Sequence, residues 1–541
     1  MKRFIICLLT GSLLCAGLAG CGASTGAPEQ SAPQAAGAGD TVIVLDDGGI
    51  TVDGAAISTD EAEAVYAAHD IVFYLEGQDF TYGEGSEADA HSQAEADAHT
   101  VVHITRPGTY VLSGGLSAGQ IAVDLGDRAE EDPEAVVTLI LNGVDITCSV
   151  APAVIFYNVY ECGSADTQTA GKDVDTSAAG ANVIIADGTE NTVTGSYVAR
   201  IYKPDSVELS EDGTGVVNSK KLHKYDGAFY SKRSMNVTGG EEDTGILTIN
   251  AGNEGLDSEL HLTINSGNIN ITSGNDGINT NEDGVSVTTI NGGTLNIVVT
   301  GSTGEGDGID SNGWLVINGG TVTSAAYGGS QDAGIDSDMG IYVNGGVVLA
   351  TGNMLDRLEE GGQNYAVFTF AQKQSGGTAY TLKNAGGGVA AKWTPANDFT
   401  CLVASFPELT AGEYTFWQGD TQLATSGAAM GGGMGPMGGM EMPEGFKAPE
   451  NRPEGMPEDR PEGMPGGPKD KEGDMPVNDD GTITLPDGTT VDPTQIKRPE
   501  GGRGGGFGGR QPQEGEAVGE LSDSFTVAEG GNFFGGVTAA Q

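Results

Sequence analysis

The chain has 541 residues, of which 89 are glycine, about 16 % against a usual share of roughly 7 %. This excess excludes an ordinary helical enzyme. With 76 acidic and 25 basic side chains the net charge is −51, which disfavours nucleic acid and anionic lipid headgroups as partners and favours cations.

The amino terminus predicts export and membrane anchoring. Lys2 and Arg3 precede an apolar run over residues 4–18, which is too short to span a bilayer comfortably but has the charge and length of a secretory signal. The run ends in Leu18-Ala19-Gly20-Cys21, which resembles the lipobox of bacterial lipoproteins, where the Cys thiol is acylated and becomes the first mature residue. We therefore predict a lipoprotein signal peptide over 1–20, a lipid on Cys21 and a flexible tether over 21–40. A plain signal peptide with a chance cysteine is the alternative.

Cysteine usage indicates no disulfide framework. Cys7 and Cys15 leave with the signal and Cys21 carries lipid, so an odd number remains: Cys148, Cys162 and Cys401. One bridge from Cys148 to Cys162 and two buried thiols in adjacent strands are equally compatible with this count.

Residues 41–160 alternate β-rich runs with turns. The runs are Thr41–Leu45, Val101–Ile104, Gly108–Gly114 and Val136–Gly143. Within the β-rich amino-terminal segment over 41–100 we expect a helical turn or two near 60–68. We also expect a polar, exposed insertion over 84–99.

Two phrases recur between about residues 226 and 352, and this internal repetition decides the fold prediction. The first ends in Asn followed by small residues, with its Asn at 250, 265, 291, 318 and 344. The second contains Asp or Asn two places after a Gly, and its copies are 254–258, 276–280, 307–311 and 333–337, with 226–230 as a looser forerunner.

Spacings of 26 or 27 residues between Asn265, Asn291, Asn318 and Asn344 are typical of stacked β coils, one period to a coil. Ile and Val would fill the interior, while Thr, Ser and Asn face water. The Gly after each Asn would supply a positive φ at a corner, which explains the glycine excess.

Past residue 352 the pattern changes. We predict a β-rich carboxy-terminal cap over 353–426, a disordered Gly/Pro/Met-rich segment over 427–520 and a returning strand in 521–541. Residues 481–485 form a short β-like patch within the disordered segment.

The repeats would stack acidic side chains about 4.8 Å apart in two columns. One column holds Asp257, Asn279, Asp310 and Asp336, and the other holds Glu254, Asp276 and Asp307. Unit charges at that separation repel by roughly 3 kcal/mol at an effective dielectric near 20. Cations between the carboxylates would remove this cost, and an all-oxygen ligand set points to calcium. A hydrogen-bonded, solvated ladder without metal is the alternative.

Catalysis has few candidate residues. No Lys or Arg occurs from Ser234 to Asp356, so the base of a calcium-dependent polysaccharide lyase would come from Lys220, Lys221, Lys224, Lys232 or Arg233. A hydrolase would need paired carboxylates, for which Asp276 with Asp283 or Asp307 with Asp310 are available. Aromatic residues that could stack on sugars are Trp314, Tyr327 and Tyr342, although core packing is the commoner fate of each.

The chain resembles one known family from about Val101 to Val403. The resemblance is carried by Arg106-Pro107-Gly108-Thr109-Tyr110-Val111-Leu112-Ser113-Gly114, by Val137-Thr138-Leu139-Ile140-Leu141-Asn142-Gly143 and by the two repeated phrases. With these residues the chain resembles the pectate-lyase-like, right-handed parallel β-helix proteins of bacterial surfaces that are described as carbohydrate-binding domain proteins. Members of that family bind cellulose and acidic polysaccharide and carry calcium. Membership implies an all-β, right-handed parallel β-helix over 101–352. It also implies calcium near Asp276, Asn279, Asp307, Asp310 and Asp336, while the inserted segment 164–181 departs from the family pattern.

From the residues and the resemblance together we expect a lipid-anchored, non-catalytic protein of the extracellular face of a bacterial membrane. It would bind pectin-like or cellulosic polysaccharide through calcium held by Asp257, Asp276, Asn279, Asp307, Asp310 and Asp336. A calcium-dependent lyase, a β-helical hydrolase and a structural adhesin or spacer are the alternatives.

Overall fold

The computed structural model describes residues 37–163, 165–427, 483–484, 490–491 and 520–540. The chain divides into two compact units, one formed by residues 1–427 with 514–541 and the other by 428–513. The predicted signal peptide, the lipid site Cys21, most of the tether and nearly all of the segment predicted to be disordered lie outside the described residues. In the second unit, β36 (Ile483–Thr484) pairs antiparallel with β37 (Thr490–Val491), at the predicted β-like patch.

The fold is all-β, as the sequence predicts. Helix is confined, among the described residues, to α1 (Gln93–Asp97) and two 3-10 turns at Ala129–Glu131 and Pro204–Ser206. No described helix has the length and apolar character needed to cross a membrane.

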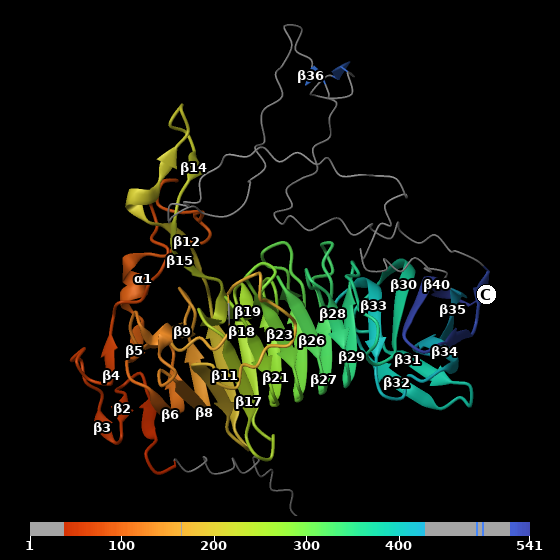
Figure 1. Ribbon diagram of the computed structural model, residues 1–541, viewed down its shortest axis with the longest axis horizontal. Coiled ribbons are helices and arrows are strands. Elements are labelled where there is room, and N and C mark those ends of the chain that lie inside the picture. The colour runs from red at the N-terminus through yellow and green to blue at the C-terminus, as the bar shows by residue number, and fades with distance from the viewer. Residues whose placement is uncertain (1–36, 164, 428–482, 485–489, 492–519, 541) are drawn as a thin grey trace, which may run out of the picture. The chain divides into compact units, whose positions relative to one another are not determined.

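A first stack of strands pairs in parallel, each strand with the one a turn further along the chain (Figure 1). Its members are β1 (Thr41–Leu45), β6 (Gly108–Leu116), β8 (Val137–Thr147), β10 (Ala181–Ile185), β17 (Met235–Gly239), β20 (Leu262–Ile264), β23 (Val287–Ile290), β26 (Trp314–Ile317) and β28 (Ile341–Val343).

A second parallel stack begins with the carboxy-terminal halves of β6 and β8, whose pairing shifts register after Leu112. It continues with β11 (Glu190–Gly195), β18 (Ile246–Ala251), β21 (Asn268–Ser273), β24 (Thr294–Val299), β27 (Thr321–Ala325) and β29 (Val347–Gly352).

A third parallel stack carries the second repeated phrase. It consists of β5 (Thr100–Ile104), β7 (Gly119–Asp124), β9 (Val154–Asn158), β16 (Gly227–Ser231), β19 (Glu254–Ser258), β22 (Ile278–Thr280) and β25 (Ile309–Ser311). From β17 to β27 the chain visits the first, second and third stacks in that order, again and again.

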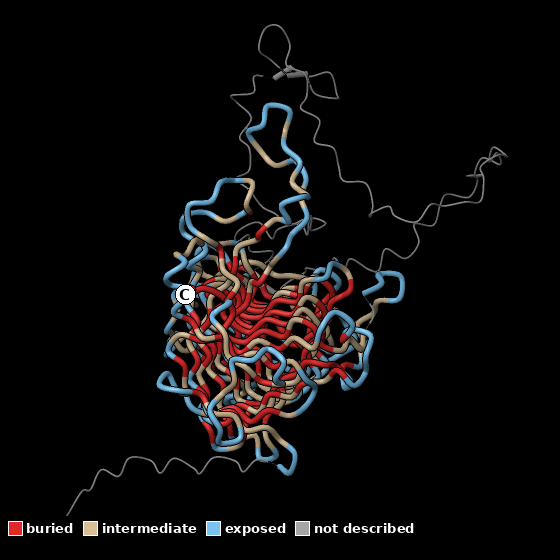
Figure 2. Tube along the Cα trace, turned by 90° about the vertical axis from the view of Figure 1, so that its left-hand side faces the viewer, coloured by how far each residue is buried: buried red, intermediate tan, exposed pale blue. Residues whose placement is uncertain are grey.

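The core lies between the stacks. Ile and Val side chains such as Ile264, Ile290 and Ile317 are almost fully buried, and Figure 2 shows the buried positions as stacked inner rungs with exposed loops around them. Asn265, Asn291, Asn318 and Asn344 form a hydrogen-bonded ladder at spacings of 26, 27 and 26 residues. The first copy of that phrase differs, because Asn250 lies on β18 in the second stack.

The corner prediction needs a correction. Positive φ falls on the second glycine of each Asn-Gly-Gly, as at Gly293 (83°) and Gly320 (80°), and not on the glycine directly after Asn. A Cβ at Gly320 would come within 2.7 Å of the Gly293 carbonyl oxygen, so both conformation and space require glycine there.

A group of mostly antiparallel strands follows the last turn. It consists of β30 (Tyr365–Gln374), β31 (Tyr380–Asn384), β32 (Val389–Trp393), β33 (Phe399–Ser405), β34 (Gly412–Gln418), β35 (Thr421–Gly427), β38 (Leu521–Ser522), β39 (Phe525–Val527) and β40 (Gly531–Ala539). β33 pairs antiparallel with β29 and so covers that edge of the second stack, while β40 joins β30 in parallel. A separate, aromatic core around Phe368 and Phe416 holds these strands together.

At the amino-terminal end, β2 (Thr51–Val52) pairs antiparallel with β1 and with β3 (Ala55–Ala56). β4 (Val65–Ala68) pairs antiparallel with β5. The helical turn expected near 60–68 is therefore wrong, since its apolar residues complete a sheet instead. The insertion over 84–99 is only partly exposed. It contains α1, whose Ala96 is buried, and its last residue, His99, is buried as well.

An antiparallel arm interrupts the stacks. It consists of β12 (Val198–Tyr202) with β15 (Lys221–Tyr225), extended by β13 (Glu208–Leu209) with β14 (Val216–Asn218) (Figure 1). Of the two states that the cysteines left open, the structure has the unbridged one: Cys148 and Cys162 are free thiols, with Cys148 buried and Cys162 partly exposed.

Candidate functional site

The third stack places the predicted oxygen column in register. Asp257 on β19 pairs with Asn279 on β22, which pairs with Asp310 on β25. Asp336 follows in the next turn, since its N–H donates to the carbonyl of Ile309 at 2.7 Å. Parallel pairing with one residue per strand at each level brings these four side chains to one face.

The second predicted column is tied together by backbone donors. The Asp307 N–H donates to Asp276 Oδ1 at 2.7 Å, and the Ala333 N–H donates to Asp307 Oδ1 at 2.5 Å. Glu254 Oε1 accepts a hydrogen bond from Asn279 Nδ2 at 3.0 Å, which links the two columns. These contacts are those of a hydrogen-bonded ladder, and they satisfy one oxygen of each of these three carboxyl groups.

Burial makes ionisation of these carboxyl groups costly. Burial, with the charge of Asp226 added, raises the pKa of Glu254 to about 8. Burial also raises the pKa values of Asp257, Asp276 and Asp307 well above the ordinary range, and that of Asp310 to about 7. The cause is the same in each case, namely loss of water around the carboxylate followed by repulsion from its neighbours.

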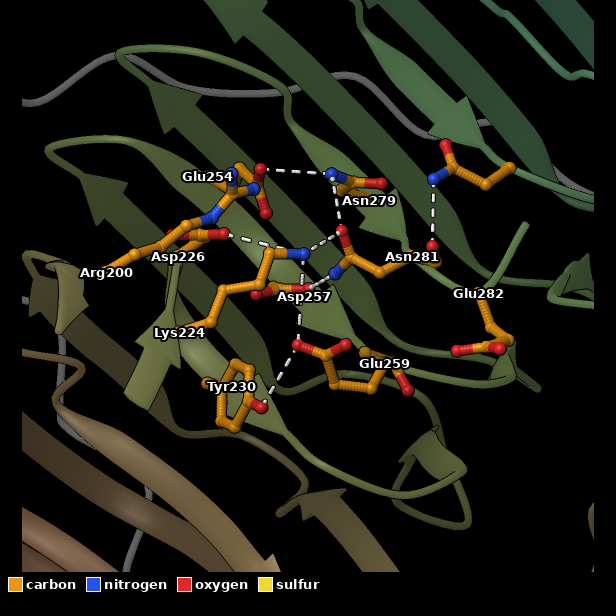
Figure 3. A network of polar contacts seen from close by, with 12 residues as sticks. Arg200, Lys224, Asp226, Tyr230, Glu254, Asp257, Glu259, Asn279, Asn281 and Glu282 are labelled. Carbon is orange, nitrogen blue, oxygen red and sulfur yellow. Dashed lines mark hydrogen bonds and ion pairs between the residues drawn. The ribbon is translucent and has the colours of Figure 1, made fainter. Parts of the chain in front are cut away.

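A single lysine enters this acidic face from the arm. Figure 3 shows Lys224 of β15 among Asp226, Asn281 and Glu259. Its Nζ donates to Asn281 Oδ1 at 2.9 Å and lies 3.7 Å from Asp226 Oδ2 and 3.9 Å from Glu259 Oε1. Burial lowers the pKa of Lys224, but the carboxylates of Glu259, Asp226, Asp257 and Glu254 outweigh it, so the pKa stands above its usual value. Lys224 is therefore a cation at neutral pH.

The network continues from Asn281 to the column. Asn281 Nδ2 donates to Asp257 Oδ1 at 2.5 Å, and the Tyr230 hydroxyl donates to Glu259 Oε1 at 3.2 Å. One lysine offsets one of several acidic charges here. The face as a whole stays acidic.

Three buried oxygens of this face have no hydrogen-bond partner: Glu254 Oε2, Asp257 Oδ2 and Asn279 Oδ1. A buried polar oxygen without a partner is costly, so the two carboxyl groups call for a proton or a cation, and the amide oxygen of Asn279 calls for a hydrogen-bond donor or a cation. They are the hard oxygen donors that calcium prefers. Within the described ranges, however, no three Asp, Glu, His or Cys side chains converge as a metal-binding group. A bound calcium would need amide, carbonyl, water or ligand oxygens as well.

The other predicted bases lie elsewhere. Lys232 Nζ sits over the Tyr157 ring at 4.3 Å, and Arg233 pairs with Glu130. Lys224 is the one member of the predicted set that, among the described residues, lies beside the acidic columns, through its contacts with Asn281, Asp226 and Glu259. Of the carboxyl pairs proposed for hydrolysis, Asp283 is exposed and accepts from Asn312.

The predicted sugar-stacking residues do not form one platform. Trp314 begins β26, Tyr327 packs against Gly301 after β27, and Tyr342 on β28 lies beneath Lys172. Of the three, Tyr342 contacts the inserted segment 164–181, through Lys172.

Sequence reasoning missed Asp226, Glu259 and Asn281 as parts of the site. A signal for all three existed, since Asp226 opens the forerunner phrase 226–230, at the place that Glu254, Asp276 and Asp307 take in the later copies. Glu259 and Asn281 each stand two residues after a column member, and Asn312 occupies the same position after Asp310. Because side chains alternate along a strand, positions two apart share a face.

Comparison with known proteins finds a family model that matches part of the chain. Residues 98–357 match the model of the family described as "Carbohydrate-binding domain-containing protein". Among solved structures, the chain is similar to a polysaccharide lyase-like protein from C. thermocellum, solved as a gadolinium derivative, with 20 % sequence identity and a TM-score of 0.31. That match covers 57 % of this chain and 92 % of the other. A search of curated proteins found no match. The match over residues 98–357 supports carbohydrate binding.

Proposed function

We propose, from the match of residues 98–357 to a carbohydrate-binding family, that this protein is a non-catalytic polysaccharide-binding lipoprotein of the bacterial cell surface. Its ligand is an acidic, pectin-like polysaccharide, bound through calcium on the acidic face of the third stack. The single observation that carries the calcium proposal is the set of buried, unpartnered oxygens on Glu254, Asp257 and Asn279.

The same proposal takes the three parallel stacks as the faces of a right-handed parallel β-helix. The repeated order of the stacks along the chain and the spacing of 26 or 27 residues in the Asn ladder support it. The antiparallel strands after β29 then serve as the cap of its open edge.

Calcium would be held by Glu254, Asp257 and Asn279 in one region, and by Asp276, Asp307, Asp310 and Asp336 in the next turns. When bound, it supplies positive charge that both neutralises the columns and accepts oxygens from an anionic sugar. This matters because a uronate and a chain of net charge −51 repel each other without a bridging cation. The oxygens missing from the metal-binding group would then come from the ligand and from water.

The test uses affinity electrophoresis of the full chain in gels containing polygalacturonate, with millimolar calcium or with EDTA. We expect retardation in calcium and its loss in EDTA. Asp257→Asn should weaken the calcium-dependent binding by about tenfold or more, the usual cost of a lost charged contact. Asp205→Asn, which changes an exposed aspartate on the arm, is the matched control and should behave as wild type. Equal retardation in calcium and EDTA would overturn the calcium part of the proposal.

A lyase is the second candidate, because Lys224 lies within the acidic face. A lysine with a raised pKa holds its proton and is a poor base, and this favours binding over elimination. A lyase would release unsaturated uronides from polygalacturonate, detected by ultraviolet absorbance, and Lys224→Ala would abolish that release. A hydrolase would release new reducing ends and lose them in Asp307→Asn. A spacer or adhesin would neither bind nor cleave.

A further inference from the structure

Residues 172–177, here called the strap, belong to the segment that departs from the family pattern and lie over the first stack. At one end the buried Thr176 donates from Oγ1 to Asn236 Oδ1 at 2.9 Å and shares a hydrogen bond with Thr263 Oγ1 at 2.7 Å. At the other end, Lys172 Nζ lies 5.3 Å from the ring centre of Tyr342.

The strap runs along the stack, across its strands. Thr263 pairs with Thr289, Thr289 with Val316 and Val316 with Tyr342, so the two ends of the strap lie three turns apart. A groove of about 450 Å³ lies between the strap and these strands. Its floor is made by Thr263, Thr289 and Val316.

An amide ladder forms the strand-side wall of the groove. Asn291, Asn318 and Asn344 each donate from Nδ2 to the Oδ1 of the preceding ladder Asn, at 3.0, 2.9 and 2.8 Å. Each amide has two N–H donors and two acceptor positions, so the ladder leaves one donor on each of these exposed residues for a ligand. A free N–H donor therefore recurs about every 4.8 Å along the groove.

The groove is close to electrically neutral. Its strand side is built from amides, hydroxyls and Val316, and on the strap Lys172 Nζ pairs with Asp173 Oδ1 at 2.6 Å. An anionic chain would meet Asp175 there without a compensating cation. A polymer of neutral hydroxyl groups finds donors and acceptors at each turn.

We infer that this groove is a second carbohydrate site, independent of calcium, which takes an uncharged polysaccharide chain lying along the stack between the strap and the Asn ladder. The inference rests on carbohydrate binding as proposed above but not on its calcium. The inserted segment would then contribute to ligand binding, because the strap forms one wall of the groove over the first stack.

The test is affinity electrophoresis of the full chain in EDTA with three soluble neutral polysaccharides, a β-glucan, a xylan and a galactomannan. We expect at least one to retard the wild type, and Asn318→Leu to weaken that binding about tenfold or more. Asn296→Leu is the matched control, because Asn296 is equally exposed and donates to Asn270 at 3.0 Å on the second stack, outside the groove. If Asn318→Leu fails to fold, Lys172→Ala, which frees the end of the strap, should weaken binding instead.

Two results would overturn the inference: no neutral polysaccharide retards the chain in EDTA, or Asn318→Leu and Asn296→Leu weaken binding equally. Polygalacturonate in calcium serves as the separate readout for the acidic face. Its loss with neutral binding intact would contradict only the calcium proposal, and the reverse would contradict only the groove.

Discussion

Without divalent cations, the stability of this fold should fall as the pH rises. Glu254 is buried, and its pKa of about 8 in the fold stands above its ordinary value of 4.5. The neutral form is therefore the one that the fold favours. The stability that this group contributes is fully present below pH 4.5 and is lost as the pH rises through about 8. For this one group, the free energy of unfolding should drop by about 3 kcal/mol by pH 7.

The assay is thermal unfolding followed by circular dichroism in EDTA, in steps from pH 5 to pH 8. The wild type should lose several degrees over this range, because a few kcal/mol moves the melting temperature by that amount in a unit of this size. The general repulsion within a chain of net charge −51 also lowers stability as pH rises, so a variant must isolate the local effect.

Glu254→Gln is that variant, and Glu131→Gln, at an exposed position, is its control. Glu254→Gln should make the loss of stability with rising pH less steep, by the share of this one group, while Glu131→Gln should leave the wild-type slope. Millimolar calcium should make the wild-type curve less steep and raise it more at pH 8 than at pH 5, because calcium binds the ionised carboxylates and a larger share of these groups is ionised at the higher pH. A melting temperature that stays level or rises from pH 5 to pH 8 in EDTA would refute this reasoning.

Three further predictions concern stability and reactivity. Lys224→Ala should destabilise the fold by about 1–3 kcal/mol at pH 7, measured by urea unfolding, with Lys221→Ala as the control; equal losses in the two variants would contradict the ion-pair network. Gly320→Ala should cost more than Gly284→Ala, because both have positive φ but only Gly320 has backbone within 2.7 Å of the new Cβ, and urea unfolding that ranks them the other way would contradict the corner packing. Burial raises the pKa of Cys148 to about 11, so in the native protein its thiol should resist alkylation at pH 8 while urea releases it; mass spectrometry showing rapid native labelling would contradict its burial.

The repeats predicted the columns because, in stacked parallel strands, residues one period apart become neighbours. The ladder from Asn265 to Asn344 and the register of Asp257, Asn279 and Asp310 follow directly from that spacing. Asn250 shows the limit of the rule. It carries the same phrase but stands only 15 residues before Asn265 (265 − 250), which signals a different stack.

Contacts made by residues outside the repeats could not be predicted from the spacing. Lys224 bonds to Asn281 across 57 residues, and Thr176 meets Thr263 across 87. Both depend on how an arm or an insertion folds back over the stacks, which local patterning does not encode. α1 is a different case, because Ser92 and Glu95 form a capping box, and their spacing of three residues in the sequence would have predicted the start of this helix.

The most direct test of the acidic face is isothermal titration of calcium chloride into the EDTA-treated, dialysed full chain at pH 7.5. We predict saturable binding that is strongly weakened when Asp257→Asn and Asp276→Asn are combined and unchanged in Asp205→Asn. No heat of binding beyond dilution, together with an unmoved melting temperature, would contradict the account.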